Sequence, residues 1–149
     1  MNKYKLAIKI AVEAHQNQKD LLGEPYIMHP MRVAIKLETE EQKILGVLHD
    51  TVEDAGIRVE DIEQMFGEKI AKRLDLLTHK KGVRYEEYIV KLSEDLVCRR
   101  VKLADLMDNI MVDRVKKLPD TEETYLRLKK YYKAIKFLNG GLTRTQYLK

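Results

Sequence analysis

The stretch GVLHDTVEDAG, residues 46–56, contains four side chains capable of acid, base or metal chemistry within six consecutive positions: His49, Asp50, Glu53 and Asp54. Imidazole and carboxylate groups together bind divalent cations, and a carboxylate beside such a cation can accept or deliver a proton. The stretch therefore fits a metal site with an acid/base pair. It also fits a polar helix surface that faces solvent.

Helical geometry separates the polar and apolar residues of this stretch. At about 100° per residue, the four polar side chains fall in an arc of roughly 140°. Nearly opposite lies an apolar stripe of the kind that faces a core, formed by Ile44, Leu45, Leu48, Val52 and Ala55. Taken alone, the pattern favours an exposed polar face over a binding site.

Two other segments supply groups of the same kind. In GEPYIMHPMRVA, His29 stands directly before Pro30, at the junction of a loop and a helix. In VKLADLMDN, a helix would place Lys102, Asp105 and Asn109 within an arc of roughly 60°, flanked by apolar residues. A carboxylate buried there needs a partner, and a metal ion would supply one. The combined nitrogen and oxygen ligands suit Mn²⁺, Fe²⁺, Zn²⁺ or Mg²⁺.

Composition limits the class of protein. A chain of 149 residues with 44% hydrophobic and 35% charged residues can form one domain with one core. No run of about 18 apolar residues could cross a membrane, and the N-terminus lacks the pattern of a secretion signal. The single cysteine, Cys98, cannot form an internal disulfide. These features favour a cytoplasmic protein.

Charge is unevenly distributed along the chain, although the net charge is only +4. Residues 38–63 contain nine Asp and Glu against two Lys and Arg, and residues 114–149 contain ten Lys and Arg against three Asp and Glu. If these segments meet, a carboxylate-rich metal site faces a cationic wall, which suits a phosphate-bearing small molecule. Solvated helix faces are the alternative. The basic residues have neither interleaved aromatic residues nor an accompanying motif, which disfavours nucleic acid as a partner.

Hydrophobic periodicity predicts helices along almost the whole chain and almost no strand. Pro30 and Thr39 fit helix starts, the latter with Gln42 in a capping box, and Gly56 fits a helix end. The predicted helices span residues 4–18, 30–37, 40–54, 60–66, 68–77, 85–96, 97–115 and 122–138. Residues 142–149 are too short and mixed in composition to assign.

Four sequence blocks, in this order, resemble a known family. They are AHQNQ…GEPYIMHPMRVA, LGVLHDTVEDAG, DIEQMFGEKIAKRLDLLT and VKLADLMDN, and the similarity covers about residues 5–138. The order H…HD…D resembles the HD-domain metal phosphohydrolases. The four blocks together resemble the hydrolase domain of the RelA/SpoT alarmone enzymes and their small stand-alone relatives. The resemblance implies an all-α, single-domain HD-type helical bundle over residues 1–149, with residues 139–149 as a C-terminal tail.

The resemblance also implies roles for particular residues. One Mn²⁺ ion would be held by four ligands: His29, His49, Asp50 and Asp105. Glu53 and Asp54 complete an intact HDxxED pattern and would be the acid/base pair acting on a metal-polarised water. Such a reaction needs no nucleophilic side chain, because a metal ion lowers the pKa of its bound water.

The resemblance extends to substrate contacts. Asn109 matches a family position that contacts the sugar region of the nucleotide. Arg127 and Tyr131 resemble a substrate-contacting pair, with a solvated Arg127 and a core-packed Tyr131 as the alternative. Lys102 would either support a phosphate group or form a structural salt bridge.

Two further histidines are expected to take no part in the chemistry. His15 follows an alanine in the first predicted helix, where packing is the favoured interpretation. His79 falls in a lysine-rich loop and is expected to be exposed to solvent.

One departure from the family pattern bears on the substrate. The alarmone hydrolases usually carry a basic pair after AHQNQ that engages the guanine nucleotide, whereas this sequence has Asp20 and Leu21. A guanidinium can stack on a base and attract phosphate, but Asp20 is expected to repel phosphate and Leu21 offers only apolar contact. The substitution leaves the metal chemistry intact and leaves the identity of the base open.

The leading interpretation is a metal-dependent phosphohydrolase that removes the 3′-pyrophosphate of (p)ppGpp or a related nucleotide. The same metal centre could instead act on another phosphorylated nucleotide or cofactor, such as NADPH. A catalytically silent nucleotide-sensing module is a third interpretation. Because the hydrolase-like blocks occupy nearly the whole chain, no synthetase segment is expected.

Overall fold

The computed structural model describes all 149 residues, and its regular structure is helical apart from an isolated bridge between Lys19 and Pro25. The helices are α1 (Lys3–Ala14), α2 (Met28–Ile35), α3 (Glu40–Leu48), α4 (Thr51–Ala55), α5 (Val59–Phe66), α6 (Glu68–Leu77), α7 (Tyr85–Ser93), α8 (Leu96–Asn109), α9 (Val112–Val115), α10 (Glu122–Leu138) and α11 (Arg144–Leu148). The all-α class predicted from the sequence is thereby confirmed.

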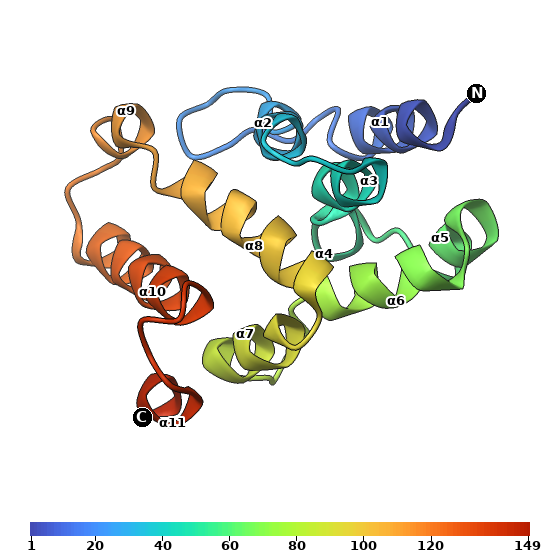
Figure 1. Cartoon of the computed structure of the whole chain (residues 1–149). Helices are drawn as coiled ribbons and strands as arrows, with labels where there is room; N and C mark the ends of the chain where they lie inside the picture. Colours follow the sequence, from blue (N-terminus) through green and yellow to red (C-terminus); the bar gives the residue numbers. More distant parts are fainter.

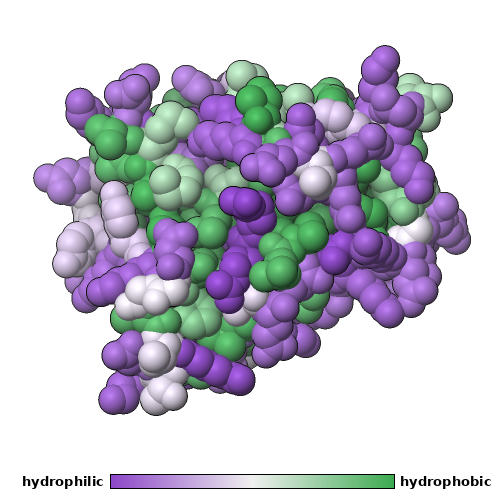
Figure 2. All heavy atoms as spheres, in the orientation of Figure 1, coloured by the Kyte–Doolittle hydropathy of each residue, from purple (hydrophilic) through white to green (hydrophobic).

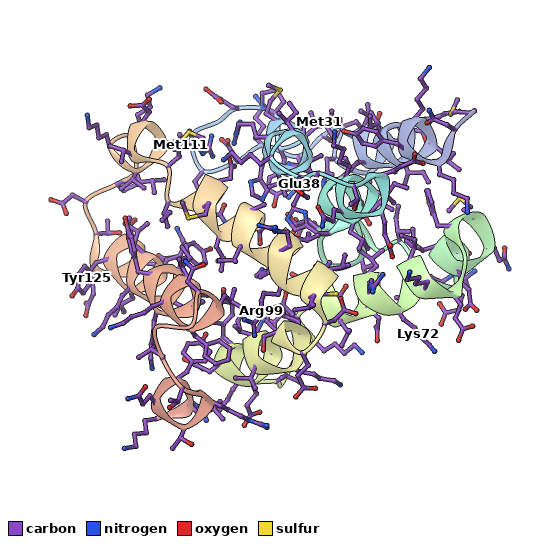
Figure 3. All side chains as sticks on the ribbon, in the orientation of Figure 1. Met31, Glu38, Lys72, Arg99, Met111 and Tyr125 are labelled. Carbon is purple, nitrogen blue, oxygen red and sulfur yellow. The ribbon has the colours of Figure 1, made fainter.

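Helix α8 crosses the middle of the molecule, and the other helices are arranged around it (Figure 1). It contacts α2 and α3 on one side, α6 and α7 near its N-terminus, and α10 on the remaining side. Arg99 of α8 donates hydrogen bonds to the carbonyl oxygens of Ser93 at 3.1 Å and Leu138 at 3.2 Å (Figure 3). These carbonyls end α7 and α10 and have no partner within their own helices. One guanidinium therefore attaches the ends of both helices to α8.

The starts of several helices follow local sequence signals. Thr39 and Gln42 form the predicted capping box at the start of α3. The side chain of Thr121 accepts a hydrogen bond from the amide of Thr124 at 3.2 Å, which satisfies one free donor of α10. Asp95 caps α8 in the same way through the amide of Cys98 at 3.0 Å. These caps fix where α3, α8 and α10 begin, and thus the register of the residues that they carry.

The predicted helix over residues 40–54 is wrong in one respect that matters for the site. The structure breaks it between α3 and α4, at His49 and Asp50, and Asp50 has φ −101° and ψ −1°. The hydroxyl of Thr51 donates to the carbonyl oxygen of Leu48 at 2.7 Å, satisfying the end of α3. Because of this break, His49 is buried, at 3% exposed, and does not share one solvent-facing arc with Glu53.

The buried apolar side chains form a single cluster of 26 residues that reaches the C-terminal end of the chain. Helix α11 begins at a capping box of Thr143 and Gln146, which the sequence analysis left unassigned. Its Tyr147 is 1% exposed and stacks on Phe137 of α10, with ring centroids 4.6 Å apart. The core predicted over residues 5–138 thus extends into the segment expected to be a tail.

The surface shown in Figure 2 is a mixture of hydrophilic and hydrophobic side chains, with strongly hydrophilic residues gathered near the centre of this face. Exposed apolar residues include Tyr125, which points outward from α10 at the edge of the molecule (Figure 3) and is 63% exposed. None of the helices combines the length and the apolar character needed to cross a membrane.

Candidate active site

The four predicted metal ligands lie together where α2, α8 and the break between α3 and α4 meet. His29 Nε2 is 2.8 Å and His49 Nε2 is 3.2 Å from Oδ1 of Asp105. Asp50 Oδ2 is 3.0 Å from His49 Nε2 and 3.7 Å from His29 Nε2. His29, His49 and Asp105 are buried, and one donor atom from each lies within 4.8 Å of the others. Three separate parts of the sequence thus converge on one small volume.

A close approach of two helices makes this convergence possible. A Cβ on Gly46 of α3 would lie 2.8 Å from Leu37 Cδ1 and 3.4 Å from the Cα of Ala34, which is part of α2. A side chain at this position would displace the end of the Leu37 side chain and would touch the backbone of α2. Gly46 also accepts a hydrogen bond from His49 Nδ1 through its carbonyl oxygen, at 2.6 Å. The glycine therefore both brings His29 near His49 and orients the His49 ring.

Both imidazoles are oriented by an acceptor on Nδ1. His29 Nδ1 lies 2.6 Å from Asp108 Oδ2, and His49 Nδ1 is bonded to Gly46. A carboxylate and a carbonyl oxygen can only accept, so Nδ1 is the protonated nitrogen of each ring and Nε2 is left to face Asp105. An unprotonated Nε2 and a carboxylate oxygen are both acceptors, and they can lie this close only with a proton or a cation between them. The residues fit a divalent cation.

The charge balance supports the same conclusion. Burial lowers the pKa of His49, but the carboxylates of Asp50 and Asp105 outweigh it and hold that pKa well above its ordinary value. For Asp105, burial raises the pKa, while Lys102 and the two histidines lower it well below the usual range. The site thus holds its carboxylates in the ionised form and attracts positive charge, which is the requirement for binding a cation.

Asp108 is a functional residue that the sequence analysis missed. Its side chain is fully buried and accepts from Arg32 Nε at 2.8 Å and Nη2 at 3.0 Å, in addition to His29. Burial raises the pKa of Asp108, but His29 and Arg32 together hold it far below its usual range. The helical spacing of Asp108 from Asp105, and of Arg32 from His29, was the available signal. Asp108 and Arg32 therefore position an imidazole without facing the candidate metal site themselves.

Lys102 and Asn109 also contact the Asp105 carboxylate, Lys102 at the remaining oxygen and Asn109 at the oxygen that faces the histidines. Lys102 Nζ is 2.8 Å from Oδ2, and Asn109 Nδ2 is 3.4 Å from Oδ1. Burial lowers the pKa of Lys102, but Asp105 and the neighbouring Tyr88 and Tyr85 hold it well above its ordinary value. Lys102 therefore forms the salt bridge that was one of its two predicted roles, and it also lines the cavity described below.

Glu53 and Asp54 extend from α4 beside the candidate metal ligands. The Glu53 carboxylate accepts the backbone N–H of His79 through Oε1, and Asp54 Oδ2 accepts from Gln18 Nε2 at 3.2 Å. Burial raises the pKa of each carboxyl, and the negative charge of Asp50 raises it further. Oε2 of Glu53 and Oδ1 of Asp54 have no hydrogen-bond partner in the protein. These two groups can therefore exchange protons with a bound molecule.

Most of the predicted site residues line one cavity of about 490 Å³. Every predicted site residue lines it except His49, which lies behind the wall. Arg127 and Tyr131 of α10 are among the lining residues, although Arg127 also pairs with the exposed Glu123 at 3.0 Å. The cavity is large enough for a ligand of nucleotide size, and its lining combines carboxylates, cations and aromatic rings.

Two residues outside the predicted set also contact the site. Tyr26 donates to Asp50 Oδ2 at 2.5 Å. His79 was expected to be exposed, and that expectation is wrong, because its ring stacks on Tyr88 at 4.7 Å and lines the cavity. The sequence could not reveal this, since the contact depends on α6 ending opposite α7.

His15 is buried at 1% exposed, as the packing interpretation predicted. Its Nδ1 lies 2.7 Å from Gln18 Oε1, and the amide of the same glutamine donates to Asp54. His15 thus belongs to the hydrogen-bond chain that orients Asp54.

Comparison with known proteins identifies the family. The family model described as HD domain matches residues 7–87, and the chain belongs to this family. The HD domain implies a divalent metal ion, in agreement with the grouping of His29, His49 and Asp105.

Two proteins with similar sequences show which HD-domain proteins this chain resembles. The chain is 36% identical over 116 residues to the guanosine-3′,5′-bis(diphosphate) 3′-pyrophosphohydrolase of Aquifex aeolicus, a match covering 70% of this chain and 17% of that protein. It is 34% identical over 120 residues to the bifunctional (p)ppGpp synthase/hydrolase SpoT of Escherichia coli, covering 70% of this chain and 17% of that one. The chain thus spans less than a fifth of these relatives.

A solved structure shares the fold of this chain over almost all of the chain's length. It is a metazoan ortholog of SpoT that hydrolyses ppGpp, and it matches with a TM-score of 0.76 at 23% sequence identity. The match covers 99% of this chain and 91% of the other. The helical arrangement described above is therefore that of a known hydrolase fold.

Proposed function

We propose that this chain is a divalent-metal-dependent phosphohydrolase that removes the 3′-pyrophosphate of (p)ppGpp or a related nucleotide. The observation that carries the proposal is the convergence of His29, His49, Asp50 and Asp105 at the wall of a nucleotide-sized cavity. The similarity to the Aquifex aeolicus and Escherichia coli enzymes supports the choice of substrate.

In this proposal four side chains hold the cation: His29, His49, Asp50 and Asp105. Mn²⁺ is the proposed ion, and the mixed nitrogen and oxygen donors are also compatible with Fe²⁺, Zn²⁺ or Mg²⁺. When bound, such an ion lowers the pKa of water and withdraws negative charge from a phosphate group. Two residues would orient the ligands without contacting the cation: Asp108 would orient His29, and Tyr26 would orient Asp50.

Glu53 and Asp54 act as the acid/base pair. Each has one carboxylate oxygen held by the protein, through the His79 amide and the Gln18 side chain, and one oxygen free to meet a ligand. The raised pKa of each carboxyl brings its proton affinity closer to that needed for general acid and base catalysis near neutral pH. One would accept the proton of the attacking water while the other supplies a proton to the leaving oxygen.

Substrate binding is assigned to the opposite wall of the cavity. Arg127 and Tyr131 of α10 would contact the phosphate groups, and Asn109 would contact the sugar. Lys102, already paired with Asp105, would supply positive charge next to the reacting phosphate.

The direct test is the release of pyrophosphate from purified protein treated with chelator and then reloaded with a single metal. Mn²⁺-loaded protein should release pyrophosphate from ppGpp, and chelated protein should not. Plain GTP, which has no 3′-diphosphate, is the matched control substrate. A Mn²⁺-loaded protein that leaves both ppGpp and pppGpp intact would contradict the proposal.

A second candidate substrate is a phosphorylated cofactor such as NADPH. It is favoured by the presence of Asp20 and Leu21 in the loop where the alarmone hydrolases have a basic pair. This activity would release inorganic phosphate rather than pyrophosphate, so one panel with both products measured separates the two candidates.

A further inference from the structure

The loop before α2 and the short helix α9 meet through an ion pair at one end of the cavity. Arg114 Nη2 lies 2.9 Å from Asp20 Oδ2, and both residues line the cavity together with Leu21 and Leu118. Figure 1 shows how the long connection between α1 and α2 extends toward α9, which makes this contact across 94 residues of sequence. The contact raises the question of what this end of the cavity binds.

Both carboxylate oxygens of Asp20 accept hydrogen bonds from the protein. Its Oδ1 accepts the amides of Leu22 at 2.9 Å and Glu24 at 3.0 Å, and its Oδ2 accepts from Arg114. The Asp20 side chain is only 7% exposed. The expectation that Asp20 repels phosphate is therefore wrong, because Arg114 balances its charge and its oxygens are already occupied.

Arg114, in contrast, retains most of its hydrogen-bonding capacity. A guanidinium has five N–H donors, and the hydrogen bond to Asp20 is the only one that the Arg114 side chain forms in the structure. Asp20 restricts the position of this side chain without using up its donors. The result is a guanidinium anchored at one nitrogen at the wall of the cavity, with donors left to bind paired acceptors of a planar ligand.

The two ends of the cavity differ in charge. The α9 end has the Asp20–Arg114 ion pair and two leucines, with Lys19 beside Asp20. The α7 and α10 end has Lys130, whose ammonium lies 4.5 Å from the Tyr85 ring centroid and has no ion pair. Burial lowers the pKa of Lys130, and the nearby charges of Lys102 and Arg127 lower it further. The cations at the α7 and α10 end suit phosphate groups. The leucine side chains and the free guanidinium donors at the α9 end suit the face and the edge of a nucleobase.

We infer that Arg114, held by Asp20, recognises the base of the substrate and selects a 6-oxopurine. A guanidinium pairs in bidentate fashion with the adjacent O6 and N7 acceptors of guanine, whereas adenine presents an amino group at position 6. This inference rests on the proposed function for the identity of the reaction. It also resolves the open question left by Asp20 and Leu21, because the guanidinium is supplied by α9 instead of by the loop.

The experiment compares guanine and adenine nucleotides in the wild-type protein and in three arginine variants. Arg114→Gln should reduce kcat/KM for ppGpp by about tenfold to a hundredfold, mainly through KM, and should change ppApp little. Arg127→Gln, at the phosphate end, should reduce both substrates in equal proportion. Arg58→Gln, on an exposed ion pair outside the cavity, is the surface control.

Asp20→Asn tests the role of the anchor. Asparagine keeps an acceptor for the Leu22 and Glu24 amides but removes the charge that holds Arg114. The variant should weaken the preference for ppGpp over ppApp less than Arg114→Gln does, and the double variant should match Arg114→Gln alone. Circular dichroism and thermal unfolding establish that each variant is folded.

Binding of GDP and ADP to chelated protein, measured by calorimetry, keeps this inference separate from the proposed activity. Wild-type protein should bind GDP more tightly than ADP, and Arg114→Gln should lose that difference. If no nucleotide is hydrolysed but this difference is present, the proposed reaction fails and the inference stands. Equal losses for GDP and ADP in Arg114→Gln, no loss for either, or no GDP binding by wild-type protein would each overturn the inference.

Discussion

His29 and Asp108 are joined by a 2.6 Å hydrogen bond between Nδ1 and Oδ2, and the same imidazole is contacted at Nε2 by Asp105 at 2.8 Å. Helix α8 therefore contacts both nitrogens of one ring with two carboxylates placed three residues apart. Carboxylates that orient a metal-binding histidine in this way commonly change metal affinity about 10- to 100-fold when removed. The His29 ring is fixed by its neighbours before any ligand arrives.

Asp108→Asn should weaken metal binding by about tenfold or more, because the amide accepts less strongly than the carboxylate and leaves Arg32 without its ion-pair partner. Calorimetric titration with Mn²⁺ measures the effect directly. Asp108→Ala should in addition lower the free energy of unfolding by about 3–5 kcal/mol, since Arg32 loses a buried partner. Unchanged Mn²⁺ affinity in Asp108→Asn would show that Asp108 serves stability alone.

Substitutions at Glu53 and Asp105 should affect catalysis and metal binding differently. Glu53→Gln should reduce turnover about 10²- to 10⁴-fold, the usual contribution of a general acid or base, while Mn²⁺ affinity stays close to that of the wild type. Asp105→Ala should abolish both. Metal content of the dialysed proteins and steady-state rates provide the two readouts. Equal metal loss in the two variants would contradict this division of roles.

The residues that converge at the candidate metal site could be selected from the sequence because each lies in a short block with a fixed pattern, such as His49-Asp50 in HDTVED. The break between α3 and α4 could not, because ideal helical geometry continues smoothly through residues 44–54. The structure ends α3 there so that His49 enters the core and Asp50 faces the cavity. The local pattern thus selected the residues but placed the His49 side chain on the solvent-facing side of a helix, whereas the structure buries it.

The missed contacts share a different cause. Asp108 to His29 and Arg114 to Asp20 each join residues more than 75 positions apart. Helical spacing can place Asp108 on the same face of its helix as Asp105, but it cannot name the partner, since these pairs depend on how α8 and α9 pack against the N-terminal part of the chain. Long-range ion pairs therefore require the structure, whereas helix starts such as Thr39 follow from adjacent residues.

Ionisation of Glu53 is predicted to destabilise the metal-free protein. Burial, opposed by the His79 amide and reinforced by Asp50, raises the pKa of Glu53 in the folded state. A raised folded pKa contributes stability that is present below the unfolded pKa and is lost as pH rises through the folded value. Glu53→Gln should therefore unfold at a higher temperature than wild type at pH 7 in chelator.

The same difference should shrink at pH 4, which lies below the ordinary pKa of a glutamate and favours protonated Glu53 in both states. Thermal unfolding at the two pH values measures it, with Glu87→Gln on the exposed face of α7 as the matched control. A difference that is equal at pH 4 and pH 7 would mean that the ionisation of Glu53 is not its cause.

Tyr147 tests whether the C-terminal segment belongs to the folded core. Its ring is stacked on Phe137 and fully enclosed, so Tyr147→Ala should lower the free energy of unfolding by about 3–5 kcal/mol. Its hydroxyl is buried without a hydrogen-bond partner. Tyr147→Phe should therefore be as stable as wild type or more so, because it removes an unsatisfied polar group and keeps the stacked ring. Urea unfolding of the three proteins provides the comparison. If Tyr147→Ala were as stable as wild type, α11 would contribute nothing to the core, and the boundary expected at residue 138 would be correct after all.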